Sequence, residues 1–321
     1  DNSKHVKVFT VIDRIYDINI SKSTFKIEAE ILLTWINTDD HFKLKSNFDE
    51  DTFSNQEMRD ILKDIWHPKF IVQSEIHRRE TLFSTLHINP NGSLELFEKF
   101  ETTLPFNTQI RQYPFGELNL NLGIVAFTHD AKEMEFDPVY FEIGHQNQDE
   151  QVLIGDWTLV DSYLEKKLVD RLSTKSQKYS QNSFHFIIKH DFKDMFQRIF
   201  IPLGGVIVIS LFLTLFSSLR FEQNKMMRVG SQLTLLLTTF ALKFSLGDSI
   251  PHTHYLNLID LVFLIATGVI VLNLFSSIII SELYLIGTYK NINKLELLFD
   301  WITPLIALIA LIGSIYTVFY N

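Results

Sequence analysis

Apolar and polar residues alternate along several short stretches of the first 195 residues. In TFKIEAEILLTWI (24–36) every second residue is apolar, and ELNLNLGIVAF (117–127) and SFHFIIKH (183–190) follow the same rule. A period of two is typical of strands that bury one face in a core. Turn sequences such as NPNG (89–92) separate these stretches. The pattern predicts an immunoglobulin-like antiparallel β-sandwich, with a short amphipathic helix at 55–65.

The last third of the chain consists of long apolar runs. Residues 199–219, 261–281 and 301–321 are three runs of 21 residues that contain no charged side chain. A helix of about 20 residues spans the roughly 30 Å hydrocarbon core of a membrane. With one more polar segment after the first run, we expect four transmembrane helices at about 197–219, 226–247, 256–283 and 297–320. Core helices of a soluble protein are the weaker interpretation, because such runs rarely occur together there.

Charge divides the chain at the same place. Residues 1–195 carry 32 acidic and 22 basic side chains, a net charge of −10, whereas residues 196–321 carry six acidic and seven basic ones. An acidic domain without a basic cluster argues against nucleic acid as a partner. The chain has no cysteine, which excludes disulfides and thiolate metal sites. We therefore expect two domains, an outer β-sandwich at 1–195 and a membrane domain at 196–321.

The short loops of the membrane domain predict its orientation. Arg220, Lys225 and Arg228 lie between the first and second helices, and Lys290 and Lys294 lie between the third and fourth. The loop SIPHTHYLN (249–257) between the second and third helices has no basic residue. Because basic loops stay in the cytoplasm, the large N-terminal domain and the C-terminus are expected outside. The prediction is a multi-pass protein of the cell (inner) membrane, in contact with membrane lipids.

The second membrane helix has an unusual face. Residues spaced by four and three share one face of a helix, and here they are Gly230, Thr234, Leu237, Ala241, Phe244 and Asp248. Packing against neighbouring helices explains the small residues but not Asp248 at the outer end. Several copies of this helix around an axis would line a pore, with hydrophobic constrictions at Leu237 and Phe244. The pore interpretation therefore requires an oligomer.

The chain lacks the common catalytic motifs. There is no GxSxG, no P-loop and no dinucleotide fingerprint, and the pair His252 and His254 has no third metal ligand nearby. We expect no enzymatic activity, no cofactor and no metal. Two other classes remain open: a non-conducting membrane receptor or sensor would need a larger cytoplasmic part, and a small four-helix transporter would need acids near the membrane midplane.

Four motifs together resemble the pentameric ligand-gated ion channels, the superfamily of Cys-loop receptors and their bacterial relatives. WHP (66–68) is similar to the family's W-x-P segment, and YPFGELNLNLGIVAF (113–127) to its signature turn and strand. FIPLG (200–204) is similar to the start of its first membrane helix, and SIPHTHY (249–255) to its linker between the second and third helices. The missing cysteine pair implies the bacterial type. Gly116 and Leu118 replace the usual Asp and Gln of the signature turn.

The resemblance implies a homo-pentamer that binds a small-molecule agonist, a cationic amine or protons, in an aromatic box between adjacent outer domains. It assigns ligand binding to Phe127, Tyr179, Phe184, Glu30 and Trp35, with Tyr179 and Phe184 on a capping loop, KSQKYSQNSF (175–184). Packing in the β core is the competing interpretation, above all for Phe184 and Trp35. The resemblance assigns the coupling of ligand binding to gating to residues at the membrane junction: Asp17, Asn19, Tyr113, Pro114, Phe115, His190, Pro251, His252 and His254. The histidines among them predict modulation by pH.

Charges at the two ends of the second helix predict selectivity. Asp248 at the outer mouth and Glu222 at the inner end, together with the acidic outer domain, favour permeant monovalent cations. The positive charge of Arg228 opposes cation selectivity if its side chain faces the pore axis. Lys243 is expected either to reach towards water or to pair with an acid such as Asp248 or Asp260. The predicted function is a pentameric, cation-selective, ligand-gated ion channel with a hydrophobic gate.

Overall fold

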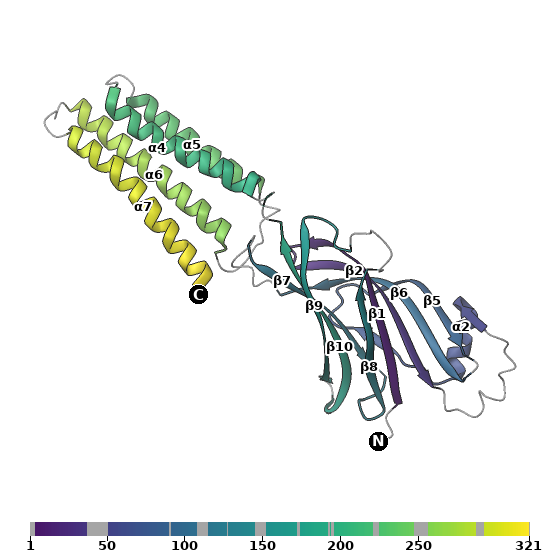
Figure 1. Ribbon diagram of the computed structural model, residues 1–321. Helices are drawn as coiled ribbons and strands as arrows, with labels where there is room; N and C mark the ends of the chain where they lie inside the picture. Colours follow the sequence, from purple (N-terminus) through teal and green to yellow (C-terminus); the bar gives the residue numbers. More distant parts are fainter. Residues whose placement is uncertain are drawn as a thin grey trace. The chain divides into compact units, whose positions relative to one another are not determined.

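The computed structural model describes residues 4–36, 51–89, 91–107, 115–126, 128–144, 152–171, 174–191, 193, 196–220, 225–246, 256–286 and 292–320. The chain divides into two compact units (Figure 1). Unit 1 comprises Asp1–Thr108 and Leu118–Lys189, and unit 2 comprises Gln109–Glu117 and His190–Asn321. Strands make up most of unit 1, and helices make up most of unit 2. The assignment of an outer role to residues 1–195 and a membrane role to residues 196–321 stays a prediction.

Unit 1 contains two β-sheets. The order of strands is β3-β5-β6-β2-β1-β8 in the six-stranded sheet and β4-β7-β10-β9 in the four-stranded sheet. The strands are β1 (Lys4–Asn19), β2 (Thr24–Ile36), β3 (Asp51–Ser54), β4 (Phe70–Val72), β5 (Glu80–Ile88), β6 (Ser93–Pro105), β7 (Glu117–Ala126), β8 (Met134–Ile143), β9 (Trp157–Arg171) and β10 (Thr174–His190). β1 pairs antiparallel with β2 but parallel with β8, so the prediction of an antiparallel sandwich is wrong for this pair of strands. The expected amphipathic helix is confirmed as α2 (Asn55–Asp64).

Apolar side chains from both sheets meet in the core of unit 1. Along β2, Phe25, Ile27, Ala29, Ile31 and Leu33 are fully buried, which confirms the predicted alternation. Phe141 of β8 lies 5.0 Å from Phe184 of β10 between ring centroids, so the two sheets face each other across these side chains. Burial of these apolar surfaces stabilises the pairing of the sheets. The finer assignment to an immunoglobulin-like sandwich stays a prediction.

The segment 175–184 differs from its prediction as a loop. It forms part of strand β10, and Ser180, Gln181, Asn182 and Ser183 are all fully buried. Buried polar side chains need hydrogen-bond partners, and the Gln181 amide donates to Gln73 Oε1 at 2.5 Å and to Ser183 Oγ at 2.7 Å. The polar composition suggested a loop because a partner such as Gln73, which is distant in the sequence, cannot be recognised from the local pattern.

Unit 2 contains four long helices: α4 (Ile201–Arg220), α5 (Lys225–Ser245), α6 (Leu258–Leu285) and α7 (Ile292–Tyr320). A π-helical turn, Phe196–Phe200, leads into α4. α5 packs against α4 and α6, and α7 packs against the same two helices (Figure 1). α7 begins at Ile292 rather than near residue 297, because the helix includes the polar residues that precede the apolar run 301–321.

The prediction of four membrane-spanning helices is confirmed in part. Among the described residues, Phe196–Thr214 and Leu258–Leu283 are long and apolar enough to cross a membrane, and Trp301–Ala310 is a shorter apolar helical segment. α5 does not pass this test because serine, threonine, glutamine and lysine side chains interrupt its apolar residues. The four-helix transmembrane bundle as a whole stays a prediction.

Candidate functional site

One face of α5 is exposed in the single chain. It contains five of the six residues expected to line a pore: Gly230, Thr234, Leu237, Ala241 and Phe244. Leu237 is 62% exposed and Phe244 is 83% exposed, whereas Gln232 and Thr239 on the other side of α5 are at most 1% exposed. The predicted stripe is therefore the surface that α5 turns away from its own neighbours. Asp248 and Glu222 lie outside the described residues.

The hydroxyl groups on the exposed face are satisfied within the helix. Thr234 Oγ1 donates to the Gly230 carbonyl at 3.0 Å, and Thr238 Oγ1 donates to the Thr234 carbonyl at 2.9 Å. The neighbouring helices also expose large apolar side chains, such as Val208 of α4 and Leu264 of α6. The face of α5 thus combines small, hydroxyl-bearing and apolar residues, a composition that can line a passage for water and ions.

A buried polar cluster explains Gln232, which lies off the exposed face. Gln232 Oε1 accepts a hydrogen bond from Ser210 Oγ of α4 at 2.7 Å, and its amide nitrogen donates to the Ser210 carbonyl at 3.0 Å. Asn273 of α6 donates to the same Ser210 hydroxyl at 2.8 Å. All three side chains are at most 1% exposed. The cluster joins α4, α5 and α6, and no local sequence signal connects its distant members.

Lys243 of α5 forms an ion pair with Asp260 of α6. Lys243 Nζ lies 3.4 Å from Asp260 Oδ1, with side chains that are 49% and 22% exposed. This confirms one of the two expected roles of Lys243, the pairing with an acid. The charge of Lys243 is therefore partly neutralised by the neighbouring helix of the same chain.

Four of the residues expected to couple ligand binding to gating lie in the described part of the chain. Phe115 packs against Phe200, the last residue of the π-helical turn before α4, with ring centroids 6.0 Å apart. Asp17 adopts a left-handed φ of 50° at an irregularity of β1, and Asn19 Oδ1 accepts a hydrogen bond from the Lys22 amide at 2.9 Å. The His190 ring lies 2.9 Å from the Asp191 carbonyl oxygen. Tyr113, Pro114, Pro251, His252 and His254 lie outside the described residues, and the coupling role of the whole set stays a prediction.

The aromatic residues expected to bind a ligand are mostly buried. Phe184 is fully buried and Trp35 is 2% exposed, as the competing interpretation of core packing describes. Tyr179 is 7% exposed in strand β10, and its hydroxyl donates to Gln177 Oε1 at 3.2 Å. The prediction that Tyr179 lies in a loop is wrong, because β10 extends through this segment. Phe127 lies outside the described residues.

Glu30 takes part in an ion cluster on the six-stranded sheet. Lys99 Nζ lies 2.7 Å from Asp13, 3.0 Å from Glu28 and 3.2 Å from Glu30. Burial acts to lower the pKa of Lys99, but hydrogen bonds to Asp13 and Glu28 outweigh it, so the pKa is raised. The carboxylate of Glu30 is thus shared with a cation of its own sheet.

Trp66 of the W-x-P segment begins a chain of hydrogen bonds that sequence patterns did not indicate. Its indole N–H donates to His129 Nε2 at 3.0 Å, and His129 Nδ1 lies 3.0 Å from Glu133. The Lys4 ammonium lies 4.1 Å from the centroid of the Trp66 ring, within the range of a cation–π contact. Trp35 meets the same ring edge-on, at 6.5 Å between centroids.

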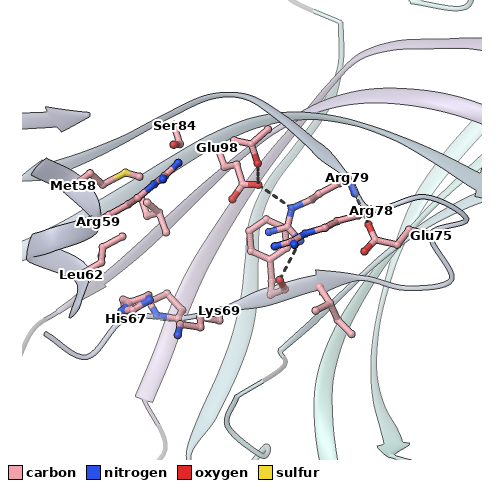
Figure 2. Close-up of a pocket in the computed structure, with 15 residues that line it drawn as sticks. Met58, Arg59, Leu62, His67, Lys69, Glu75, Arg78, Arg79, Ser84 and Glu98 are labelled. Carbon is pink, nitrogen blue, oxygen red and sulfur yellow. Dashed lines mark hydrogen bonds and ion pairs between the residues drawn. The ribbon is translucent and has the colours of Figure 1, made fainter. Parts of the chain in front are cut away.

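A basic cavity of about 470 Å³ lies between α2, the segment before β4 and strands β5 and β6 (Figure 2). Its charged lining consists of Arg59, Lys69, Arg78, Arg79, Glu75 and Glu98. Arg79 Nε donates to Glu98 at 2.8 Å, so these two charges offset each other. Burial lowers the pKa of His67 at the edge of the cavity. The excess of basic groups makes this cavity suited to an anionic group, in contrast to the acidic domain around it.

Comparison with known proteins gives two matches. No protein-family model matches the chain. The chain is 19% identical over 242 residues to a proton-gated ion channel of Gloeobacter violaceus, which covers 75% of this chain and 63% of that protein. It is 21% identical over 267 residues to the acetylcholine receptor subunit delta of Xenopus laevis, covering 78% of this chain and 49% of that protein. The chain is similar to pentameric ligand-gated ion channels.

The similarity to pentameric ligand-gated ion channels confirms the resemblance indicated by the four sequence motifs. Both relatives are channel or receptor proteins rather than enzymes. Together with the apolar helices of unit 2, the similarity identifies a membrane protein. The chain spans less than two thirds of the length of either relative.

Proposed function

We propose that five copies of this chain assemble into a ligand-gated cation channel whose pore is lined by α5. The observation that carries this proposal is the exposed stripe of α5. The exposed apolar faces of α4 and α6 suit lipid, whereas the stripe mixes hydroxyl-bearing, small and apolar side chains. One helix cannot enclose water, so the stripe requires several copies around an axis. The number five follows from the similarity to pentameric channels.

Leu237 and Phe244 form the proposed gate. They are seven positions apart, which places their rings of side chains about 10 Å apart along the pore axis at a rise of about 1.5 Å per residue. A narrow ring of large apolar side chains excludes water and thereby blocks ions without a physical plug. An agonist opens the channel by binding the open state more tightly than the closed state.

The proposed selectivity is for monovalent cations. Asp248 and Glu222, both assigned from the sequence, place carboxylates at the two ends of the pore helix. The Arg228 side chain is 4% exposed, on the side of α5 away from the stripe, so its charge does not face the proposed axis. Carboxylates at the mouths and an outer part with a net charge of −10 raise the local concentration of cations.

The proposed agonist site lies between adjacent copies of unit 1 in the outer compartment. Tyr179, Glu30 and Phe127 are its proposed contacts, with Trp35 and Phe184 supporting them from the core. One relative is named as proton-gated and the other as an acetylcholine receptor subunit, which supports protons or a cationic amine as the agonist. His190, His252 and His254 are proposed to modulate gating by pH. The channel would reside in the inner membrane, with the N-terminal domain and the C-terminus outside.

Recordings from the full chain in a planar lipid bilayer test the proposed function. With a gradient of potassium chloride across the bilayer, and with amines added or the pH varied, we expect unitary currents that reverse near the potassium equilibrium potential. A reversal near the chloride potential would contradict the cation selectivity. A folded pentamer that carries no current under any of these conditions would overturn the channel function.

Substitution of Leu237 tests the gate. Leu237→Thr should keep the channel open without agonist, or lower the half-maximal agonist concentration at least tenfold, because a hydroxyl group wets the constriction. Leu264→Thr is the matched control, since Leu264 of α6 is 60% exposed and Leu237 is 62% exposed. If both variants gate alike, α5 does not line the pore.

A further inference from the structure

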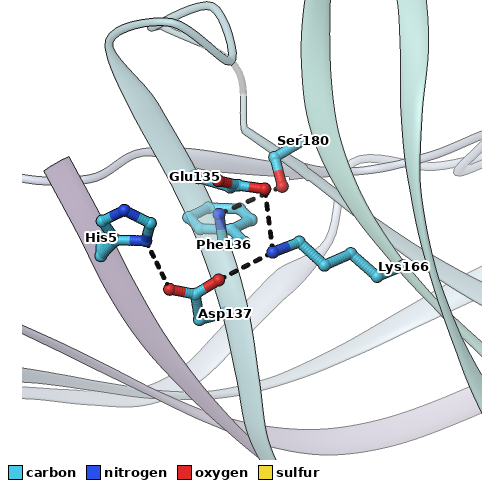
Figure 3. A network of polar contacts seen from close by, with 6 residues as sticks. All are labelled: His5, Glu135, Phe136, Asp137, Lys166 and Ser180. Carbon is cyan, nitrogen blue, oxygen red and sulfur yellow. Dashed lines mark hydrogen bonds and ion pairs between the residues drawn. The ribbon is translucent and has the colours of Figure 1, made fainter. Parts of the chain in front are cut away.

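Three side chains with metal-ligating atoms converge where β1 and β8 run side by side. His5 of β1 is paired in register with Glu135 of β8, and Asp137 lies two residues further along β8. Residues two apart on a strand project from the same face, so Glu135 and Asp137 both lie beside His5 (Figure 3). One ligand atom from each of the three side chains lies within 4.8 Å of the others.

The group already holds a cation. Lys166 of β9 places its ammonium 2.9 Å from Glu135 Oε1 and 2.7 Å from Asp137 Oδ1, while His5 Nδ1 lies 2.7 Å from Asp137 Oδ2. The site is therefore a cation-binding site of two carboxylates, occupied by the ammonium group of Lys166, with the His5 imidazole beside it.

The strands hold the ligands in place. Between the two acids, Phe136 is fully buried, and its backbone N–H donates to Ser180 Oγ of β10 at 3.1 Å. The backbone positions of Glu135 and Asp137 are thus fixed on both sides of Phe136 (Figure 3). The side chains of His5, Glu135, Asp137 and Lys166 are 57%, 32%, 36% and 34% exposed, so solvent and ions reach the site.

We propose that His5, Glu135 and Asp137 bind a transition-metal dication such as zinc in exchange for the Lys166 ammonium. One imidazole with two carboxylates is a ligand set for zinc and similar ions, whereas calcium and magnesium prefer oxygen ligands alone. Metal–ligand bonds of about 2.0–2.2 Å place tetrahedral ligands about 3.3–3.6 Å apart. Side-chain rotations bring the three ligand atoms from their present separations to that spacing, and water completes the coordination.

Lys166 therefore competes with the metal for the carboxylates of Glu135 and Asp137. A dication is attracted more strongly than an ammonium to two carboxylates, but the lysine is tethered beside them and must be displaced into water. Lys166 belongs to the four-stranded sheet, whereas the three ligands belong to the six-stranded sheet. Zinc binding therefore removes an ionic link between the two sheets of unit 1. The metal would in this way change the contact between the two sheets.

Isothermal titration of the full chain with zinc, in detergent micelles, tests the site. Lys166→Met should tighten zinc binding at least tenfold, whereas Lys166→Arg keeps the competing charge and should bind as the wild type does. His5→Gln and Asp137→Asn should each weaken this binding event at least tenfold. The matched control is His87→Gln, since His87 is a strand histidine whose ring contacts Thr52 instead.

A measurement on the unaltered chain covers the case in which a variant does not fold. Zinc should protect His5 from modification by diethyl pyrocarbonate, detected by mass spectrometry, and calcium or magnesium should not. Equal modification of His5 with and without zinc overturns the proposal. It is also overturned if Lys166→Met binds zinc no more tightly than the wild type and His5→Gln behaves like His87→Gln.

Discussion

Replacing Gln232 with methionine should weaken the association of α5 with α4 and α6. The substitution keeps a side chain of similar volume but removes the two hydrogen bonds to Ser210, at 2.7 and 3.0 Å. Hydrogen bonds between membrane helices contribute on average about 0.6 kcal/mol each and at most about 1.7 kcal/mol. The two bonds together predict a loss of about 1–3 kcal/mol in the free energy of unfolding.

Titration with sodium dodecyl sulfate, followed by circular dichroism, measures this free energy for the reconstituted protein. A double-mutant cycle with Ser210→Ala should give a coupling energy of about 0.6 kcal/mol, since the hydrogen bond from Ser210 Oγ to Gln232 Oε1 is the contact that both variants remove. Ser231→Ala is the matched control, because the Ser231 hydroxyl donates only to the Met227 carbonyl of its own helix, at 2.8 Å. A Gln232→Met variant as stable as the Ser231→Ala variant would refute the reasoning.

Three further predictions concern ionisable side chains. Lys99→Met should lower the free energy of unfolding of unit 1 by about 1–3 kcal/mol, because Asp13 and its neighbours lose a partly buried cation; an unchanged melting temperature would contradict this. Burial lowers the pKa of His67 below about 6.5, so its stabilisation is present above that pH and is lost on acidification. Melting temperatures should therefore fall less steeply between about pH 7 and pH 5 in His67→Gln than in the wild type, and equal slopes would count against it. Lys243→Met should lower the free energy of unfolding in the detergent titration by about 1 kcal/mol or less, since the ion pair with Asp260 is partly exposed. A larger decrease would contradict this.

Much of the fold follows from local periodicity. The alternation in 24–36 predicted strand β2 and its buried face, and the apolar runs predicted where α4, α6 and α7 lie. Prediction failed at 175–184, where the polar residues resemble a loop because their burial comes from tertiary packing that the local sequence does not show. It was also inaccurate at the start of α7, since a helix is bounded by backbone hydrogen bonds and not by the end of an apolar run.

The candidate site was predicted unevenly. The spacing of Gly230, Thr234 and Leu237 specifies one face of a helix, and this face is exposed in the single chain. The aromatic residues assigned to the ligand were harder to judge, because strand periodicity does not distinguish a core phenylalanine such as Phe184 from one that lines a site. Its complete burial is visible only after the second sheet is in place.

The sequence by itself determined the division into a β-rich part and an apolar helical part, and the stripe of small, hydroxyl-bearing and apolar residues on α5. These properties depend on residues close together in the chain, whose spacing decides which side chains share a face. Only the tertiary structure decided the partners of Gln232 and the cation-binding site at His5, Glu135 and Asp137. These contacts join distant parts of the chain, because burial of the apolar faces brings together polar groups that no local pattern connects.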